Sequence, residues 1–318
     1  EGLLLLAGAG LNNDGTTGWM TPMIFDIGLN KLAVVPADQL AAAPSKTNLA
    51  YQHVFSGNGL YVTFIGALNV HSDVKGISSL SSHVYLADVS SAKTYDQFLT
   101  RIQEGTQITS TEGLDRQFPS VSNNGDVVYQ AAATTSDETA MINSDAEDWS
   151  IFFVSHATNT DRRVASGIHP VWVDTNRFVF LKDDGLYIFN VPDNSEKKIW
   201  NNVSTSTMRE SLAVSDGGRY LAWSTADAAL VSVFQVSDWT AKGGITLKGY
   251  IHDPATAMVF SPDEQSIAVL APAATSSSRG SWQTYINFYN TDTFVRYSKR
   301  LKISGLEPGL AYLTDWRP

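Results

Sequence analysis

The chain has 318 residues, of which 43% are hydrophobic and 17% charged, and its 22 basic and 32 acidic residues give a net charge of −10. This length is enough to bury a large core, whereas an acidic chain with scattered lysines and arginines excludes the phosphate contacts that nucleic-acid binding requires. The absence of cysteine excludes disulfides, thiolate metal sites and a cysteine nucleophile, and no apolar run reaches the roughly 18 residues of a membrane helix.

A short apolar strand followed by a turn recurs along the chain. The turns contain Asn-Gly, Asp-Gly or Pro-Asp pairs, which suit hairpins because glycine and asparagine tolerate positive φ and proline presets the first turn angle. The five internal copies span 52–59, 118–125, 170–176, 211–218 and 257–264.

A second recurring segment lies downstream of each turn and predicts a third strand. It is a β-rich run that ends in a small polar residue before another turn and a final strand. The six copies span 24–27, 84–89, 151–155, 186–191, 231–236 and 286–290. Each unit therefore reads as four antiparallel strands, and the one helical segment that we expect is a short turn over 94–103.

The two ends of the chain together form one further copy of the unit. Residues 312–318 read into residues 1–6 reproduce the strand, turn and strand pattern of 258–269. We therefore expect an all-β, six-bladed β-propeller that is a single domain, 1–318, closed by the C-terminal strand pairing with the N-terminal strands. The expected blades are about 48–108 (one), 115–166 (two), 167–201 (three), 208–248 (four), 254–305 (five) and 308–318 plus 1–36 (six).

The repeated unit resembles the WD40-like repeat of the TolB-type six-bladed propellers. The residues that carry the resemblance are Val259-Phe-Ser-Pro-Asp-Glu-Gln-Ser-Ile-Ala-Val269 and Phe118-Pro-Ser-Val-Ser-Asn-Asn-Gly-Asp-Val-Val-Tyr129. The resemblance covers the whole chain and implies the fold. It does not select a function, because such propellers occur in a colicin-uptake protein, in oligogalacturonate lyases and as gating domains of prolyl-oligopeptidase-type enzymes.

The connections between the second and third strands differ in length and predict a binding surface. They are long at 7–20, 66–82, 131–149 and 271–281, and minimal at 182–184 and 224–227. Trp19, Trp149 and Trp282 lie at the ends of three long connections, where exposed indoles would stack on sugars or anchor a protein. The alternative interpretation is that each tryptophan is the first core residue of a third strand.

An acidic segment in one of these connections suggests a calcium site. Asp137, Glu138, Asp145 and Asp148 supply the oxygen ligands that Ca²⁺ prefers. Their spacing departs from the D-x-[DN]-x-[DN]-G pattern, so a solvated acidic loop is the competing interpretation.

Five polar residues at or near the starts of first strands would ring the mouth of an axial channel. They are His53, Arg116, His169, Arg209 and Glu210. Such a set would bind an acidic sugar or a peptide carboxylate, with the arginines acting through their bidentate forks. The competing interpretation is that these residues merely line a wet, polar channel.

These observations favour a non-enzymatic, exported binding module that recognises a protein or a glycan through its long connections. The expectation of export, to the periplasm or outside the cell, rests on the low charge and on a chain that begins at Glu1 without methionine. Two alternatives stay open: a glycan-active lyase or hydrolase at the channel mouth, and a propeller that docks onto a separate enzyme.

Overall fold

The structure is a computed structural model that describes residues 3–11, 17–27, 31–34, 49–67, 82–111, 113–133, 148–201, 211–225, 230–246, 257–274, 282–303 and 306–317. The strands of these residues form six four-stranded antiparallel sheets. The chain divides into two compact units, which we describe separately. Unit 1 comprises Glu1–Val35 and Ser204–Pro318, and unit 2 comprises Pro36–Val203.

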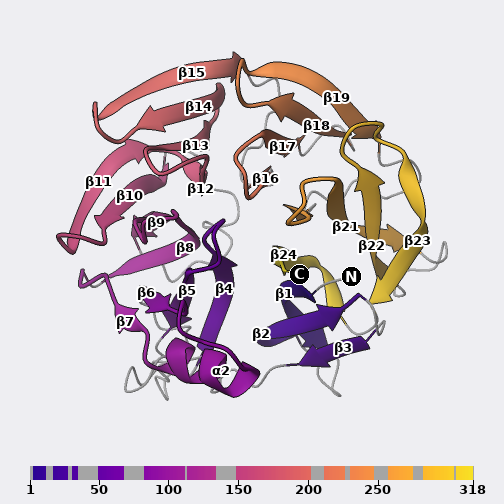
Figure 1. Ribbon diagram of the computed structural model, residues 1–318, viewed down its shortest axis with the longest axis horizontal. Coiled ribbons are helices and arrows are strands. Elements are labelled where there is room, and N and C mark those ends of the chain that lie inside the picture. The colour runs from indigo at the N-terminus through magenta and orange to yellow at the C-terminus, as the bar shows by residue number, and fades with distance from the viewer. Residues whose placement is uncertain are drawn as a thin grey trace. The chain divides into compact units, whose positions relative to one another are not determined.

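Unit 1 contains three sheets (Figure 1). The first has the order β24 (Leu306–Arg317), β1 (Leu3–Leu11), β2 (Thr17–Asp26) and β3 (Lys31–Val34). The second runs β16 (Ser211–Val214), β17 (Tyr220–Thr225), β18 (Leu230–Gln235) and β19 (Thr240–Thr246). The third runs β20 (Met258–Phe260), β21 (Ser266–Ala274), β22 (Trp282–Asn290) and β23 (Arg296–Ile303).

Unit 2 contains the other three sheets. The first runs β4 (Leu49–Phe55), β5 (Tyr61–Ala67), β6 (Ser82–Asp88) and β7 (Thr106–Gln107), with helix α2 (Tyr95–Gln103) between β6 and β7. The second runs β8 (Leu114–Val121), β9 (Val127–Ala133), β10 (Ser150–Ser155) and β11 (Thr160–Ser166). The third runs β12 (Ile168–Trp172), β13 (Arg177–Lys182), β14 (Gly185–Asn190) and β15 (Ser195–Asn201).

The local predictions of strands and helix are confirmed. All six segments predicted as third strands coincide with the third strand of a sheet, β2, β6, β10, β14, β18 or β22. The predicted helical turn is α2, which Thr94 caps by accepting a hydrogen bond from the backbone N–H of Gln97. Hairpin turn chemistry and hydrophobic periodicity are local signals, which is why the sequence carries them.

The predicted pairing of the chain ends is also confirmed. β24 pairs antiparallel with β1, with Leu3 opposite Arg317 and Leu6 opposite Leu313 (Figure 1). The C-terminal strand and three N-terminal strands thus complete one sheet.

Two of the long second-to-third connections are shorter than predicted. β1 continues to Leu11 opposite Thr17 of β2, and β21 continues to Ala274 opposite Trp282 of β22. The pairing ladder therefore runs through segments whose small residues and proline suggested loops. The connections that separate their strands most widely are 68–81 and 134–149, both in unit 2.

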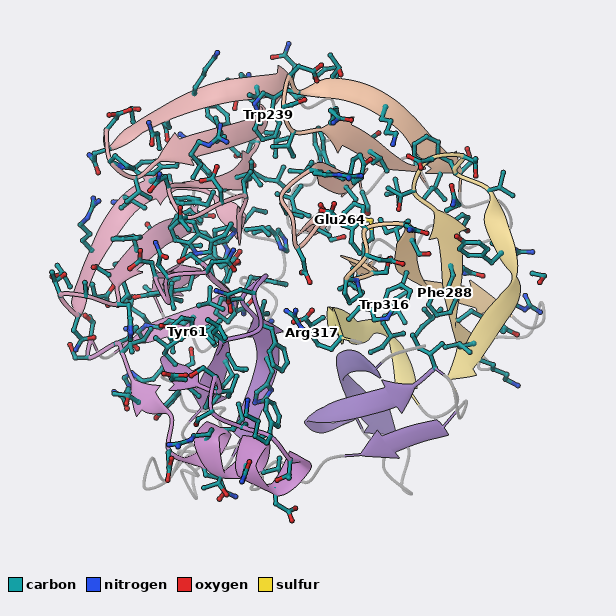
Figure 2. All side chains as sticks on the ribbon, in the orientation of Figure 1. Tyr61, Trp239, Glu264, Phe288, Trp316 and Arg317 are labelled. Atoms are coloured by element: carbon teal, nitrogen blue, oxygen red, sulfur yellow. The ribbon has the colours of Figure 1, made fainter. Side chains whose placement is uncertain are left out.

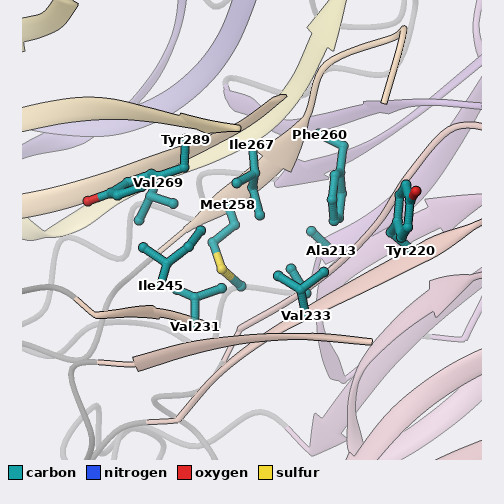
Figure 3. Packing of buried hydrophobic residues seen from close by; sticks show 11 residues of the cluster. Ala213, Tyr220, Val231, Val233, Ile245, Met258, Phe260, Ile267, Val269 and Tyr289 are labelled. Carbon is teal, nitrogen blue, oxygen red and sulfur yellow. The ribbon is translucent and has the colours of Figure 1, made fainter. Parts of the chain in front are cut away.

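The cores lie between neighbouring sheets of each unit. In unit 1, Met258, Phe260 and Val269 pack against Ala213 and Val233 of the adjacent sheet (Figure 3). On its other face the sheet β20–β23 packs against the terminal sheet, where Trp316 lies edge-on to Phe288 at 5.4 Å between ring centroids (Figure 2). Two similar cores join the three sheets of unit 2.

Within the described residues no helix has the length and apolar character that crossing a membrane requires.

Candidate functional site

The candidate site lies on the first strands of the three sheets in unit 2. Three of the five residues predicted at a channel mouth lie here, His53 on β4, Arg116 on β8 and His169 on β12, and they are 7%, 0% and 6% exposed. Arg209 and Glu210 lie outside the described residues. The structure thus places three members of the predicted set on equivalent strands, but in buried positions.

Each of these strands holds one residue in the left-handed backbone region. The residues are Gln52, Phe118 and His169, with φ of 54°, 49° and 53°, and the pairing register of each strand shifts across them. We call Gln52, Phe118 and His169 the bulge row. This conformation costs a non-glycine residue about 1–2 kcal/mol, so it persists only where surrounding contacts impose it.

Amide side chains from the preceding sheet hold two members of the bulge row. The Gln52 Oε1 atom accepts a hydrogen bond from the backbone N–H of Phe118, and the Gln130 Oε1 atom of β9 accepts one from the backbone N–H of His169, both at 2.7 Å. The ring centroids of Phe118 and His169 are 4.2 Å apart. The bulges are therefore part of the contacts that join neighbouring sheets.

Arg116 is used as a buried structural cation. Its guanidinium donates to the backbone carbonyls of Ser82 and, at 2.6 Å, Thr111, and lies 5.8 Å from the centroid of the Tyr129 ring. Its backbone N–H donates to Ser82 Oγ at 2.5 Å. These contacts fix the start of β8 against β6 and direct the guanidinium to backbone oxygens.

The neighbouring carboxyl group of Asp115 has a perturbed ionisation. It accepts a hydrogen bond of 2.7 Å from the side-chain amide of Gln117. Burial raises the pKa of Asp115 to about 6, against the opposing effects of Gln117, Ser82 and Arg116. On the last strand of the same sheet, burial also raises the pKa of Asp161, which accepts hydrogen bonds from the Tyr129 hydroxyl at 2.9 Å.

Two buried polar side chains on β8 and β9 have hydrogen-bond donors that are not used within the described part of the chain. Gln130 Nε2 and Arg116 Nε are buried and have no hydrogen-bond partner among the described residues. Donors of this kind hold an acceptor such as a buried water. His53 instead stacks on Phe64, with 4.9 Å between ring centroids. In the described part of the chain no group of three His, Asp or Glu side chains is placed to hold a metal ion.

The stacking role predicted for Trp149 is wrong. Trp149 is 1% exposed, because it immediately precedes β10 and enters the core, and its carbonyl accepts a hydrogen bond from the Gly167 N–H. The alternative interpretation, a first core residue of a third strand, therefore holds at this position. Trp19 lies within β2 and Trp282 begins β22, while their side chains lie outside the description.

The calcium prediction rests on residues that are largely outside the description. Asp137, Glu138 and Asp145 lie outside the described residues, in the connection between β9 and β10, and Asp148 is exposed at its end. The calcium site stays a prediction.

Sequence reasoning missed a second polar cluster, in unit 1. Arg317, at the end of β24, forms ion pairs with Asp315 at 2.8 Å and with Asp216 at 3.2 Å. Glu264 pairs with Arg219 at 3.0 Å and accepts a hydrogen bond from the Gly217 N–H (Figure 2 labels Glu264 and Arg317). Asp216 and Glu264 occupy corresponding turns of neighbouring repeats, which is the sequence signal that could have revealed the cluster.

The pKa of Asp216 in this cluster is raised. Burial raises the pKa of Asp216 to about 6, Asp315 and Glu264 add to the effect, and Arg317 opposes it. The described contacts of the cluster connect the β16–β17 turn, the β20–β21 turn and the end of β24, which belong to three sheets. The cluster therefore has a structural role.

The chain matches no protein-family model and no curated protein. Among solved structures, a chain of a nidogen/laminin complex aligns with 99% of this chain and 97% of its own length, at a TM-score of 0.52 and 7% identity. A Mycobacterium tuberculosis puromycin-hydrolyzing peptidase (TM-score 0.53, 10% identity) and a prolyl endopeptidase (TM-score 0.51, 11% identity) each align with 96% of this chain but only 45% and 43% of their own lengths. At these identities the similarity concerns the fold alone, a β-propeller of four-stranded antiparallel blades.

Proposed function

We propose that this protein is a non-enzymatic recognition propeller that binds a protein or a glycan through the connections between its second and third strands. The binding surface is assigned to segments 68–81 and 134–147, which join β5 to β6 and β9 to β10. The two sheets that carry these segments share a core, and both connections leave from equivalent ends of their sheets.

The observation that carries the proposal is the state of the predicted catalytic residues. His53, Arg116 and His169 are buried, and their contacts lie within the scaffold. Arg116 binds backbone carbonyls, His53 stacks on Phe64 of its own sheet, and His169 lies against Phe118 of the neighbouring sheet. A general acid or base must reach a substrate proton, and these contacts support structural roles instead. Long connections on a rigid scaffold are where recognition residues concentrate.

The finer architecture belongs to the same proposal. Six four-stranded sheets, together with the pairing of β24 and β1, support a single TolB-type domain with six blades and the boundaries inferred from the repeats. Export to the periplasm or the cell exterior is proposed from composition, as is Ca²⁺ binding by Asp137, Glu138, Asp145 and Asp148.

One observation favours the enzymatic alternative, a glycan-active lyase or hydrolase. The carboxyl of Asp115 has a pKa of about 6 beside Arg116, and perturbed carboxyls are frequent in active sites. Under this alternative, glycans would be cleaved, and Asp115→Asn would stop the release of products without changing glycan binding.

A connection exchange tests the recognition proposal. In one variant Asp-Gly replaces residues 134–147, which imitates the short β13–β14 connection at Asp183-Asp184. In a second variant the same fourteen residues are kept in scrambled order, which preserves the length and composition of the segment. Binding is measured on a glycan array and by cross-linking to partner proteins, and unfolding is followed by circular dichroism.

We expect both variants to keep the wild-type unfolding midpoint and to lose about tenfold or more in affinity, because the sequence of the segment carries recognition. Retained binding by both variants, and by the corresponding exchange of 68–81, would overturn the proposal. Turnover of a glycan by the wild type would favour the enzymatic alternative.

A further inference from the structure

The outer half of the sheet β20–β23 carries a concentration of positive charge that the net charge of the chain does not suggest. Residues 282–303 include four basic residues, Arg296, Lys299, Arg300 and Lys302, and one acidic residue, Asp292, in a chain of net charge −10. All four basic residues lie on β23, the last strand of the sheet.

Basic residues on edge strands have a common structural explanation. Lysine on an exposed edge prevents unwanted pairing with another chain, and several last strands here carry basic residues. Most of these have polar partners: Lys198 pairs with Asp184 at 2.7 Å, Lys242 pairs with Asp292, and Arg162 donates to Asn194 Oδ1 at 2.6 Å.

β23 differs because three of its cations have no carboxylate partner among the described residues. Arg296, Arg300 and Lys302 are exposed, and among the described residues none of them forms an ion pair. Arg300 stacks over the Tyr285 ring at 4.4 Å, which orients its guanidinium and leaves the N–H fork for a ligand. Asp292, the one acidic residue in 282–303, forms an ion pair with Lys242.

Exposed apolar side chains flank Arg296 in the sequence. Val295 is 65% exposed and Tyr297 is 40% exposed, whereas large apolar side chains are mostly buried in the described residues. The Tyr297 hydroxyl accepts hydrogen bonds from Ser266 Oγ at 3.4 Å and Asn290 Nδ2 at 3.3 Å, so its own O–H can donate to a carboxylate. Tyrosine and arginine beside an apolar residue are the composition typical of protein interfaces.

From this juxtaposition we propose that β23 is a docking surface for an acidic polypeptide segment that has apolar side chains between its carboxylates. Arg296, Arg300 and Lys302 bind the carboxylates, while Val295 and Tyr297 contact the apolar side chains. The register of β23 against β22 shifts between Asn287 and Tyr289, and this bulge bends the strand and interrupts its ladder. Side chains therefore carry the recognition, and strand addition does not.

The test uses the full chain and a fluorescein-labelled synthetic peptide of alternating glutamate and leucine, with binding followed by fluorescence anisotropy. Arg296→Glu/Arg300→Glu is compared with the matched control Lys93→Glu/Lys197→Glu, which makes the same charge change at exposed positions of unit 2. We expect the first pair to weaken binding about tenfold or more and the control pair to change it by less than about twofold. Tyr297→Ser should weaken binding without altering its dependence on salt.

Three results would overturn the proposal: no binding of the peptide by the wild type, equal weakening by both charge-reversal pairs, or tighter binding of a sulfated dextran than of the peptide. The last result would assign the surface to a polyanionic glycan. Because unfolding midpoints are measured for every variant, a loss caused by misfolding is separated from a loss of contact. The exchange of 134–147 leaves β23 intact, and the charge reversals on β23 leave 134–147 intact. The two experiments therefore test the docking surface and the recognition function separately.

Discussion

At the scale of single residues, the polar groups on the first strands of unit 2 act mainly on one another. Gln52 and Gln130 accept hydrogen bonds from the backbone N–H groups of Phe118 and His169, and Arg116 donates to the carbonyls of Ser82 and Thr111. Because a buried cation that loses its acceptors keeps its full desolvation cost, these contacts explain why Arg116 is tolerated where it is wholly buried.

Asp115 should make stability depend on pH. The pKa of Asp115 is about 6 in the folded state and about 3.9 in the unfolded state, so folding favours the protonated carboxyl. Its contribution to the free energy of unfolding is therefore fully present below about pH 4 and is lost as the pH rises through 6. Asp115→Asn keeps an acceptor for the Gln117 amide and removes the charge. We expect the variant to gain about 1–2 kcal/mol in the free energy of unfolding at pH 7 and little at pH 4.

Urea unfolding at a series of pH values measures this effect. The matched control is Asp238→Asn, which removes a carboxylate that is exposed and hydrogen-bonded to Thr240, and whose pKa that hydrogen bond lowers. A pH profile for Asp115→Asn that runs parallel to the wild type would show that Asp115 titrates normally.

At the scale of elements, α2 illustrates how a short helix is specified locally and then docked. Thr94 caps its first turn, while the Gln97 side chain accepts a hydrogen bond from the Lys93 N–H at 2.7 Å, a variant of the capping box. Phe98 stacks on Phe55 of β4 at 5.7 Å, and Ile102 is fully buried. The cap thus begins the helix, and the apolar side chains Phe98 and Ile102 pack it against the sheet.

Thr94→Ala should lower the free energy of unfolding by about 1 kcal/mol, because the first turn loses its acceptor. Thr94→Ser, which retains the hydroxyl, is the control and should stay near the wild type. Hydrogen exchange followed by mass spectrometry should report faster exchange over 95–103 in the alanine variant alone. Equal exchange in the two variants would mean that docking through Phe98 and Ile102 is sufficient.

At the scale of the whole molecule, the terminal sheet depends on a strand from the far end of the chain. β24 supplies the partner of β1, and its Trp316 enters the core with Phe288 while Arg317 pairs with Asp216, 101 residues away in sequence. The stability of unit 1 therefore depends on the C-terminal residues of β24.

Deletion of residues 311–318 should expose the edge of β1 and remove Trp316 from its core, so we expect aggregation and not a trimmed monomer. Size-exclusion chromatography with light scattering measures the outcome. Arg317→Ala, which keeps the strand and removes only the ion pairs, is the control and should remain monodisperse. A soluble truncated protein with wild-type unfolding would contradict the role given to β24.

The strands and their order could be predicted because their signals are local and repeated. The sites could not, for reasons visible at particular residues. Trp149 looked like an exposed anchor because it ends a polar connection, yet it is buried in the folded structure. Arg116 and His169 were grouped correctly on first strands. The hydrogen bonds from the Arg116 guanidinium to a backbone carbonyl and from the His169 N–H to Gln130, however, depend on the tertiary structure.

Local signals specify the four-stranded unit, the turns between strands and the helix cap, because alternating apolar residues and Asn-Gly or Asp-Gly turns act over a few residues. The recurrence of the repeat across the two chain ends predicts their pairing as well. Three features arise only on folding: the left-handed bulge row, the Asp216, Glu264 and Arg317 cluster, and the exposure of Arg296, Arg300 and Lys302 on β23 with no ion-pair partner among the described residues. Each of these depends on burial or charge that distant segments supply. The repeat places Asp216 and Glu264 in corresponding turns, but it does not specify their contacts.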